Sequence, residues 1–372
     1  MARTHRRRKS KLSLKASFCS CLAIFFLVGC NQKTDQESKF PDVTYNSNSI
    51  SLYGNTQGTT YAILCNDKVD VSREEIDQLL HEFDLALSTY IPNSIISKFN
   101  NSRAGKFEYI DSNGYFNDCV QLSRSVYENT NGAFDPSVFP LLEIWGFFKN
   151  FKSIPDSLQI KNTLRHIGFK PDYHYAFFPN SIDTLPSKIT KRTSQFKIVF
   201  NAIAQGQAVD VICKYLDEKG AQNYYVEIGG EVKVKGVNAQ GNVWTIGIDK
   251  PIDNSTVENR ELIHVIALEN KSVATSGNYR QFYEKDGVKY SHTINPKSGY
   301  PVTHSLLSTT VVASSCALAD GYATAFMVMG TEQTKAFIEN NKRLGLDLFL
   351  IYNNVDGEME TFSTEGFKNI LK

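Results

Sequence analysis

A carboxylate and a hydroxyl four residues apart, Asp320 and Thr324, are the side chains whose types and spacing best suit metal chemistry. They fall in a predicted helix over 317–329, where residues i and i+4 share a face. Mg²⁺ prefers hard oxygen ligands, keeps several waters and is often completed by substrate phosphates. The plain structural alternative is a threonine bonded back to the preceding turn beside a surface aspartate. On these two residues alone, that alternative is the better interpretation.

The second candidate is His292, because an unperturbed imidazole changes its protonation near neutral pH. A neutral imidazole can act as a general base that takes the proton of a hydroxyl nucleophile. A lone histidine on a strand is more often only hydrogen-bonded. Residue type alone therefore does not decide between catalysis and structure.

Two glycine-containing segments are candidate ligand contacts. The first runs from Glu227 through Gly229 and Gly230, and the second is Gly277 with Asn278. Glycine permits positive φ and a close backbone approach to a flat ligand or a phosphate. Ordinary turns explain both segments equally well, so this alternative stays open.

The elements that must position these residues follow from hydrophobic periodicity. The pattern predicts a strand pair over 50–65, and a helix that begins after Ser72, with Glu75 completing a capping box, and ends near Ser88. Further helices are predicted over 115–129, 156–168, 208–218, 317–329 and 331–342. Further strands are predicted over 196–200, 224–228, 244–248, 262–268 and 307–313. This mixture predicts an α+β fold of mixed sheets with helices, and not a doubly wound parallel sheet.

Composition narrows the function classes. Of 372 residues, 41% are hydrophobic and 21% charged, which is typical of a globular protein with a sizeable core. The 40 basic residues nearly balance the 39 acidic ones, and no basic stripe remains beyond the N-terminal segment. The chain is therefore not expected to bind nucleic acid.

The N-terminal segment resembles an export signal. Basic residues precede an apolar run over 18–28, which ends in Leu27-Val28-Gly29-Cys30. This ending resembles a bacterial lipobox, so we expect 1–29 to be a lipoprotein signal peptide and Cys30 to be lipidated. Residues 30–48 then form a flexible tether to a domain over 49–372. The alternatives are an ordinary signal peptide or a short anchor helix.

The remaining cysteines are Cys65, Cys119, Cys213 and Cys316. Each lies in an apolar stretch without metal-ligand spacing. They are predicted to be buried free thiols without a chemical role.

The sequence lacks the common phosphate-loop, dinucleotide-binding and nucleophile-elbow motifs. Four other segments, in order, resemble the FAD:protein FMN transferases, the flavin-transferring family of the ApbE type. They are Gly58-Thr59-Thr60-Tyr61; Gly132-Ala133-Phe134-Asp135 with Trp145-Gly146-Phe147; Asn201-Ala202-Ile203-Ala204-Gln205-Gly206 with Val209-Asp210; and a C-terminal block with Ala274-Thr275-Ser276-Gly277-Asn278, Ser291-His292-Thr293 and Ala319-Asp320-Gly321-Tyr322-Ala323-Thr324.

The resemblance implies a two-part α+β module with the flavin in a cleft and Mg²⁺ at the pyrophosphate. It implies metal ligands at Asp320, Thr324 and the Ala204 carbonyl, and it favours His292 as the base. It implies FAD contacts at Thr60, Tyr61, Ser88, Tyr90, Asp135, Glu227, Gly229, Gly230, Ser276, Gly277 and Asn278. For Tyr61 and Tyr90, stacking on a ring of FAD competes with a plain core role.

The expected activity is transfer of FMN from FAD to a Ser or Thr hydroxyl of an exported or membrane redox protein, with release of AMP. The alternatives are a FAD pyrophosphatase and a flavin-binding lipoprotein without chemistry. Four positions depart from the commonest family pattern, which puts affinity in doubt without removing the metal ligands: Gln57, Asn201, Gln205 and Asn295.

Overall fold

The computed structural model describes residues 44–46, 49–147, 154–180, 185–252, 261–278, 282–285 and 288–372, with the backbone alone for 44–46, 282–285 and 288–290. The predicted signal segment, Cys30 and residues 31–43 lie outside the described residues. Within the predicted tether, the structure differs at Thr44–Asn46, which form strand β1 against β2 (Ser49–Thr56). The edge of the sheet thus supplies backbone partners for these three residues, and the rest of the predicted tether lies outside the described residues.

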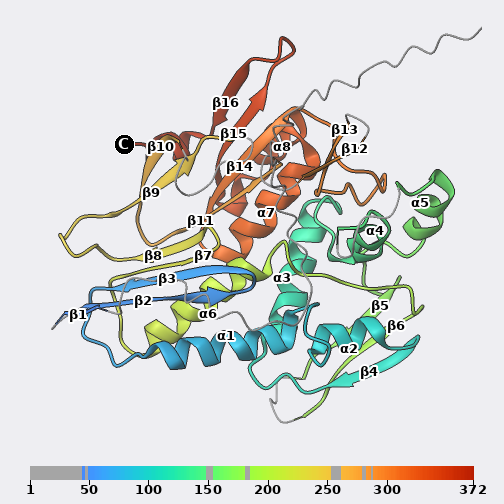
Figure 1. The fold of residues 1–372 in the computed structure, drawn as a ribbon, viewed down its shortest axis with the longest axis horizontal. Helices are drawn as coiled ribbons and strands as arrows, with labels where there is room; N and C mark the ends of the chain where they lie inside the picture. Colours follow the sequence, from blue (N-terminus) through green and yellow to red (C-terminus); the bar gives the residue numbers. More distant parts are fainter. Residues whose placement is uncertain are drawn as a thin grey trace, which may run out of the picture. The chain divides into compact units, whose positions relative to one another are not determined.

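The largest sheet of the described residues has nine strands (Figure 1). Their order is β1-β2-β3-β7-β8-β11-β14-β15-β16, and every neighbouring pair is antiparallel. The strands after β2 are β3 (Thr59–Cys65), β7 (Tyr224–Ile228), β8 (Glu231–Lys235), β11 (Ser272–Gly277), β14 (Leu306–Ala313), β15 (Asp347–Asn353) and β16 (Met359–Ser363). The expected α+β fold, a mixture of several sheets and helices, is confirmed.

Smaller sheets accompany it among the described residues. They are β4 (Gly105–Tyr109), β6 (Ser187–Lys191) and β5 (Tyr175–Phe178); β10 (Leu262–Leu268) with β9 (Trp244–Asp249); and β12 (Phe282–Lys285) with β13 (Val288–Ser291). The helices are α1 (Arg73–Leu87), α2 (Ile95–Asn101), α3 (Tyr115–Asn129), α4 (Phe139–Ile144), α5 (Ser157–Leu164), α6 (Ala204–Glu218), α7 (Cys316–Met329), α8 (Thr331–Asn340) and α9 (Glu365–Lys368).

Both faces of the large sheet are covered by a core. Successive side chains of a strand point to opposite faces, so neighbouring residues of β14 show this directly. Val311 of β14 packs in the larger core, whereas its neighbour Val312 packs in a second core on the other face. Helices α1, α3, α6 and α7 contribute to the larger core, and β9, β10 and α9 contribute to the second. The sheet thus holds α6 and α7 against one face.

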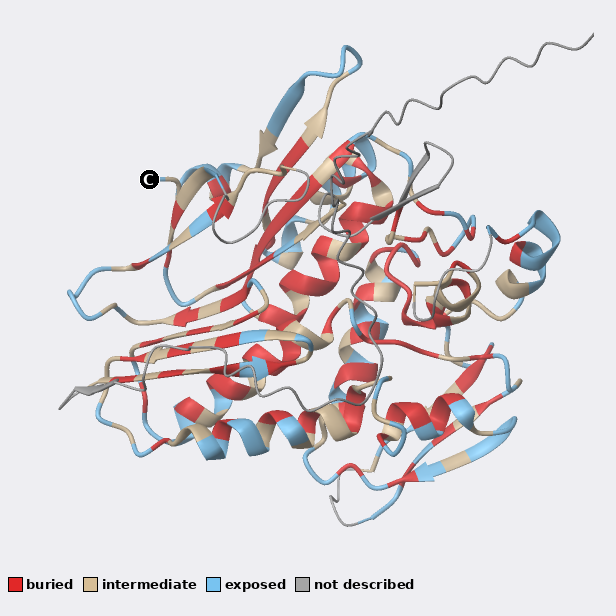
Figure 2. Ribbon diagram, in the orientation of Figure 1, coloured by how far each residue is buried: buried red, intermediate tan, exposed pale blue. Residues whose placement is uncertain are grey.

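Local signals account for the helices nearest the site. The predicted capping box at α1 is present, since Ser72 Oγ accepts from Glu75 N–H at 3.2 Å and Glu75 Oε2 accepts from Ser72 N–H at 2.8 Å. Helix α7 is apolar around most of its circumference and is buried along most of its length, as Figure 2 shows in red. A helix of that composition must lie inside a protein.

One predicted strand is wrong. Four of the residues 196–200 are buried and Lys197 is half-buried, but the segment belongs to no strand. The Asn100 side chain bonds the N–H and the carbonyl of Ile198, each at 2.8 Å, and Val199 N–H donates to the Pro136 carbonyl. An amide side chain from a distant helix thus replaces the neighbouring strand.

Helices α4 and α5 pack against the segment that follows His292. Leu141, Trp145, Ile160 and Ile294 form a small core of their own. The Trp145 indole N–H donates to the Gly299 carbonyl at 2.8 Å. This contact anchors the loop on the C-terminal side of His292.

Candidate functional site

The site centres on the place where the N-termini of α6 and α7 meet. A Cβ at Gly206 would lie 2.4 Å from the Cys316 carbonyl oxygen, so only glycine allows this approach. One turn further along α7, Asp320 Oδ2 accepts a hydrogen bond from Gly206 N–H at 3.2 Å. The two helices, yellow and orange in Figure 1, therefore bring segments 114 residues apart together.

Asp320 is 6% exposed, and burial raises its pKa to about 7, although the Gly206 hydrogen bond opposes the shift. The alternative of a surface aspartate is therefore wrong. Among the described residues, no lysine, arginine or histidine forms an ion pair with this carboxylate. A buried carboxylate is costly to ionise without a positive partner. The surroundings of Asp320 fit a bound cation.

The two other predicted ligands lie on the same helices. Thr324 is one turn beyond Asp320, and its Oγ1 lies 3.4 Å from Ser276 Oγ at the end of β11. That distance is long for a hydroxyl–hydroxyl hydrogen bond, so the two oxygens are close without being tightly bound to each other. Ala204 begins α6, two residues before Gly206. The structure thus gathers the predicted ligand residues and Ser276 at one junction.

The turn between β7 and β8 lies beside the start of α6. Gly229 and Gly230 have φ values of +63° and +110°, so the turn depends on glycine. Gly230 N–H donates to Glu227 Oε1 at 2.7 Å, and Gly229 N–H donates to the Thr60 carbonyl at 3.2 Å. The segment forms the hairpin turn that the sequence offered as one of two interpretations, and the turn places Glu227, Gly229, Gly230 and Thr60 together.

Gln205 also belongs to this neighbourhood. A Cβ at Gly229 would lie 3.0 Å from Gln205 Nε2 and 3.0 Å from Thr59 Cγ2. From the sequence, Gln205 stood out only as a departure from the family pattern, and Thr59 had no predicted role. Each is adjacent to a predicted site residue, Ala204 and Thr60 respectively, and this adjacency is the signal that could have identified them.

Asn278 organises the backbone around His292. Its Oδ1 accepts from Ser291 Oγ at 2.6 Å and from Thr293 Oγ1 at 3.0 Å, so it is bonded on both sides of the histidine. Asn278 N–H donates to the Leu307 carbonyl on β14. The partly buried His292 is thus tied to the end of β11, where Ser276 and Gly277 lie.

Two predicted FAD contacts, Tyr61 and Asp135, are buried and hydrogen-bonded within the protein. Tyr61 is 1% exposed, its ring lies against Gly54, and its hydroxyl donates to Asp77 Oδ1 at 2.7 Å. Burial, and then Asp77, raise the pKa of Tyr61. The burial of the ring supports the core role that the sequence left open, and contact of Tyr61 with FAD stays a prediction.

Asp135 is likewise buried and engaged. Its Oδ1 accepts from Ser137 N–H at 2.8 Å and from Ser137 Oγ at 2.5 Å, while Gly168 N–H donates to the same hydroxyl at 2.7 Å. Burial raises its pKa to about 7. These bonds fix the turn before α4.

Ser88 and Tyr90 follow the end of α1. Ser88 Oγ accepts from Tyr90 N–H at 3.3 Å, and the Ser88 carbonyl accepts from Ser94 Oγ at 2.7 Å. Tyr90 is 71% exposed, so its ring is accessible. Contact of these residues with FAD stays a prediction.

Two of the departures from the family pattern keep hydrogen bonds that matter locally. Asn295 Oδ1 accepts from Lys297 N–H at 2.9 Å, which aspartate could also do. Gln57 has φ +50° in the β2–β3 turn, and its buried Oε1 has no partner in the described part of the chain. Burial raises the pKa of Asp84, and the Gln57 side chain opposes this larger effect by lowering it.

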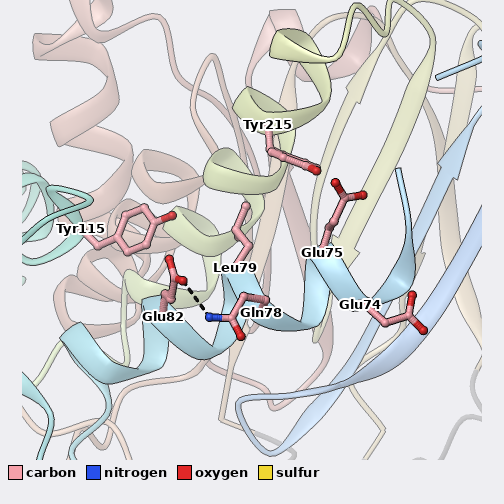
Figure 3. A pocket seen from close by; sticks show the side chains of 7 residues that line it. All are labelled: Glu74, Glu75, Gln78, Leu79, Glu82, Tyr115 and Tyr215. Atoms are coloured by element: carbon pink, nitrogen blue, oxygen red, sulfur yellow. Dashed lines mark hydrogen bonds between the residues drawn. The ribbon is translucent and has the colours of Figure 1, made fainter. Parts of the chain in front are cut away.

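The described residues form hollows on the surface, of which two are similar in size. One, of about 460 Å³, is lined by the β2–β3 turn over 55–60 and includes the predicted contact Thr60. The other, of about 470 Å³, has none of the predicted site residues (Figure 3). Its lining is Glu74, Glu75, Gln78, Leu79, Glu82, Tyr115 and Tyr215. The first hollow is the one associated with the site.

Over the ranges that the structure describes, no group of three or more His, Cys, Asp or Glu side chains could hold a metal. The predicted ligand set has one carboxylate, one hydroxyl and one backbone carbonyl, so the absence of three such side chains does not test it. Cys65, Cys119, Cys213 and Cys316 are buried and free, as expected. Within the same ranges, none of the helices has the length and apolar character needed to cross a bilayer.

Comparison with known proteins gives consistent results. The ApbE family matches residues 57–349 of the chain. A FAD:protein FMN transferase of Vibrio cholerae is 32% identical over 356 residues, covering 94% of this chain and 97% of that protein. One of Haemophilus influenzae is 33% identical, covering 87% of this chain and 92% of that protein.

Solved structures agree with the sequence matches. The flavin transferase ApbE of Vibrio cholerae superimposes with a TM-score of 0.74 at 33% identity, covering 87% of this chain and 99% of that one. The apo form of the flavinyl transferase ApbE from Pseudomonas stutzeri has a TM-score of 0.73 at 30% identity, covering 86% and 96%. With its sequence, its fold and the order of its motifs in agreement, the chain belongs to the ApbE family of flavin transferases.

Proposed function

We propose that this chain binds FAD and, with Mg²⁺, transfers the FMN half to a Ser or Thr hydroxyl of an exported or membrane redox protein. Relatives of nearly the same length that are named FAD:protein FMN transferase support the reaction. The observation that carries the proposal is the buried Asp320 carboxylate, held by Gly206 N–H beside Thr324.

In the proposed reaction, the acceptor hydroxyl oxygen bonds to the phosphorus of the FMN half. The bond from that phosphorus to the bridging oxygen breaks, and AMP leaves with this oxygen. The hydroxyl proton passes to a base. Such a transfer needs alignment and charge neutralisation more than covalent work by the protein.

Asp320, Thr324 and the Ala204 carbonyl would hold Mg²⁺, a set of hard oxygens that leaves positions for phosphate and water. The ion would neutralise charge on the pyrophosphate during attack. Asp320 is suited to this task because its Oδ2 is fixed by Gly206 N–H, while Oδ1 accepts no hydrogen bond among the described residues. Thr324 brings a hydroxyl from the next turn of the same helix.

His292 would take the proton of the acceptor hydroxyl. Asn278 supports this role, because it accepts hydrogen bonds from the side-chain hydroxyls of Ser291 and Thr293, the two sequence neighbours of His292. The loop beyond is held by the bond from Trp145 to Gly299. A base held from both sides can be aligned with a nucleophile.

The glycine turn of β7 and β8 would approach FAD closely, since Gly229 and Gly230 present backbone without side chains. Thr60 lies against this turn, and Ser276, Gly277 and Asn278 line the end of β11 near Thr324. We assign these residues, with Glu227, to FAD binding. They come from β3, β7, β8 and β11, so the sheet positions them.

Replacement of Asp320 tests the proposal at its carrying observation. Asp320→Asn keeps the shape and removes the charge that a hard cation requires, so Mg²⁺ affinity and FMN transfer should fall together. Excess Mg²⁺ should partly restore transfer. If the folded Asp320→Asn variant kept full FMN transfer with the same dependence on Mg²⁺ concentration, Asp320 would have no part in the reaction.

The location outside the cytoplasm rests on the N-terminal sequence. We propose that the enzyme is anchored to a bacterial membrane through lipid on Cys30, which would bring it near membrane redox proteins. Cys30→Ser should release the protein from membranes and leave its FAD chemistry intact. Fractionation of cells decides this, and tight membrane association of the variant would contradict the lipid anchor.

A further inference from the structure

Asp210 of α6 bridges the helix to two other elements. Its Oδ2 accepts from Ser315 Oγ at 2.8 Å and from Ala317 N–H at 3.0 Å, both at the start of α7. Its Oδ1 accepts from Lys233 Nζ of β8 at 2.6 Å. The side chains of Asp210 and Lys233 are only 21% and 25% exposed, so water screens this network weakly.

The position of Asp210 on α6 gives these bonds a consequence for the site. Asp210 lies four residues after Gly206, so both face α7. Gly206 touches the backbone of Cys316, and Asp210 bonds the N–H of the next residue, Ala317. Two contacts one turn apart thus fix the first turn of α7, and Asp320 lies on the turn that follows.

Asp210 also suits its place electrostatically. A carboxylate at a helix N-terminus is stabilised by the unpaired N–H groups and the helix dipole, as Asp210 is at α7. Lys233 balances its charge, so the network does not add a negative charge beside Asp320. Ser315 Oγ donates to Asp210 and also accepts from Leu318 N–H, so the same hydroxyl caps the N-terminus of α7.

We propose that Asp210, with Lys233, is a positioning residue that sets the distance between Asp320 on α7 and the Ala204 carbonyl on α6. This inference rests on the proposed magnesium site. Outer groups that orient metal ligands commonly change metal affinity by about 10–100-fold when they are replaced. A structural tie that served only packing would change stability and leave affinity alone.

The chain offers a matched control on the same helix. Asp217 of α6 pairs with Lys235 of β8 at 2.9 Å and accepts from Tyr224 Oη at 3.0 Å. It therefore joins the same helix to the same strand without bonding α7. Asp217→Asn should cost stability without moving the metal ligands.

The experiment measures Mn²⁺ binding by electron paramagnetic resonance and Mg²⁺ by competition, with thermal unfolding of the same metal-free samples. Asp210→Asn turns one acceptor oxygen into an amide donor, which cannot serve Ser315, Ala317 and Lys233 together. We expect its Mg²⁺ dissociation constant to rise about tenfold or more. Asp217→Asn should stay within about twofold of the parent protein, and Asp210→Glu, which keeps the charge, should fall between parent and Asp210→Asn.

The outcomes separate the claims. Saturating Mg²⁺ should restore most of the FMN transfer of Asp210→Asn, because only the ligand geometry is altered. An unchanged Mg²⁺ dissociation constant in folded Asp210→Asn would overturn the positioning role, as would equal loss in Asp217→Asn. If Asp210→Asn does not fold, Asp210→Glu decides by the same criterion. Absence of metal binding by the parent protein would instead refute the magnesium site itself, and the positioning role with it.

Discussion

Gly206→Ala tests the approach of α6 to α7, on which the site depends. The new Cβ would lie 2.4 Å from the Cys316 carbonyl oxygen and 2.9 Å from Ala317 Cα, whereas ordinary contact begins at 3.4 Å. These are backbone atoms, so the helices must separate by about 1 Å, and overpacking of this kind costs about 1–3 kcal/mol. Alanine regains about 1 kcal/mol of helix propensity.

The expected net loss is therefore up to about 2 kcal/mol, or a fall in Tm of at most about 8 °C, since domains of 150–250 residues lose about 2–4 °C per kcal/mol and larger ones lose less. Calorimetry of the metal-free protein measures it. The Asp320–Gly206 bond should lengthen at the same time, so the Mg²⁺ dissociation constant should rise about tenfold.

Gly321→Ala is the matched control for Gly206→Ala. Its Cβ would meet only the side-chain ends of Ile203 and Val126, at 3.3 and 3.4 Å, so it should stay within about 1 kcal/mol of the parent protein. If Gly206→Ala were as stable as Gly321→Ala and bound Mg²⁺ normally, the close helix contact would have no such role.

Other substitutions test the ligands, the base and a buried lysine. Thr324→Ser keeps an oxygen at the site and should retain Mg²⁺-dependent transfer, whereas Thr324→Val should lose it; equal activity of the two folded variants would remove Thr324 from the site. His292→Ala should lower transfer by about 10²–10⁴ with milder effects on FAD binding, and loss of binding with unchanged transfer rate would make it a binding residue. Lys191 donates to the Phe99, Asn100 and Phe196 carbonyls. Burial, and then Lys197, lower the pKa of Lys191 from 10.5 to about 8. Between these two pH values the folded state therefore binds fewer protons than the unfolded state. The free energy of unfolding should consequently rise with pH from about 8 to 10.5. Urea unfolding of the parent protein and Lys191→Met across pH 8–10.5 should diverge in favour of the parent, and parallel profiles would contradict this.

Signals that are local in sequence predicted local structure well. The pair Ser72 and Glu75 was enough to place the start of α1, because a capping box involves only residues three apart. The segment 196–200 was misassigned because its hydrogen-bond partner, Asn100, lies 98 residues away. Periodicity reports burial and extension, and it does not report which group completes the backbone bonds.

The same distinction separates the site residues. Asp320 and Thr324 share a helix, so their spacing could be interpreted from the sequence. That Asp320 is buried against Gly206, and that Tyr61 is enclosed with Asp77, follow from contacts between distant elements. Asp210 was part of a motif, but its role became visible only with α7 in place.

The central claim is transfer of FMN to protein, and one measurement tests it most directly. The purified enzyme is incubated with FAD, Mg²⁺ and an acceptor protein of a membrane redox system, and AMP and protein-bound flavin are quantified together. The account predicts equal amounts of the two, and neither product without Mg²⁺. AMP without labelled protein would indicate a FAD pyrophosphatase, and the absence of both would indicate a flavin carrier; either result would contradict the account.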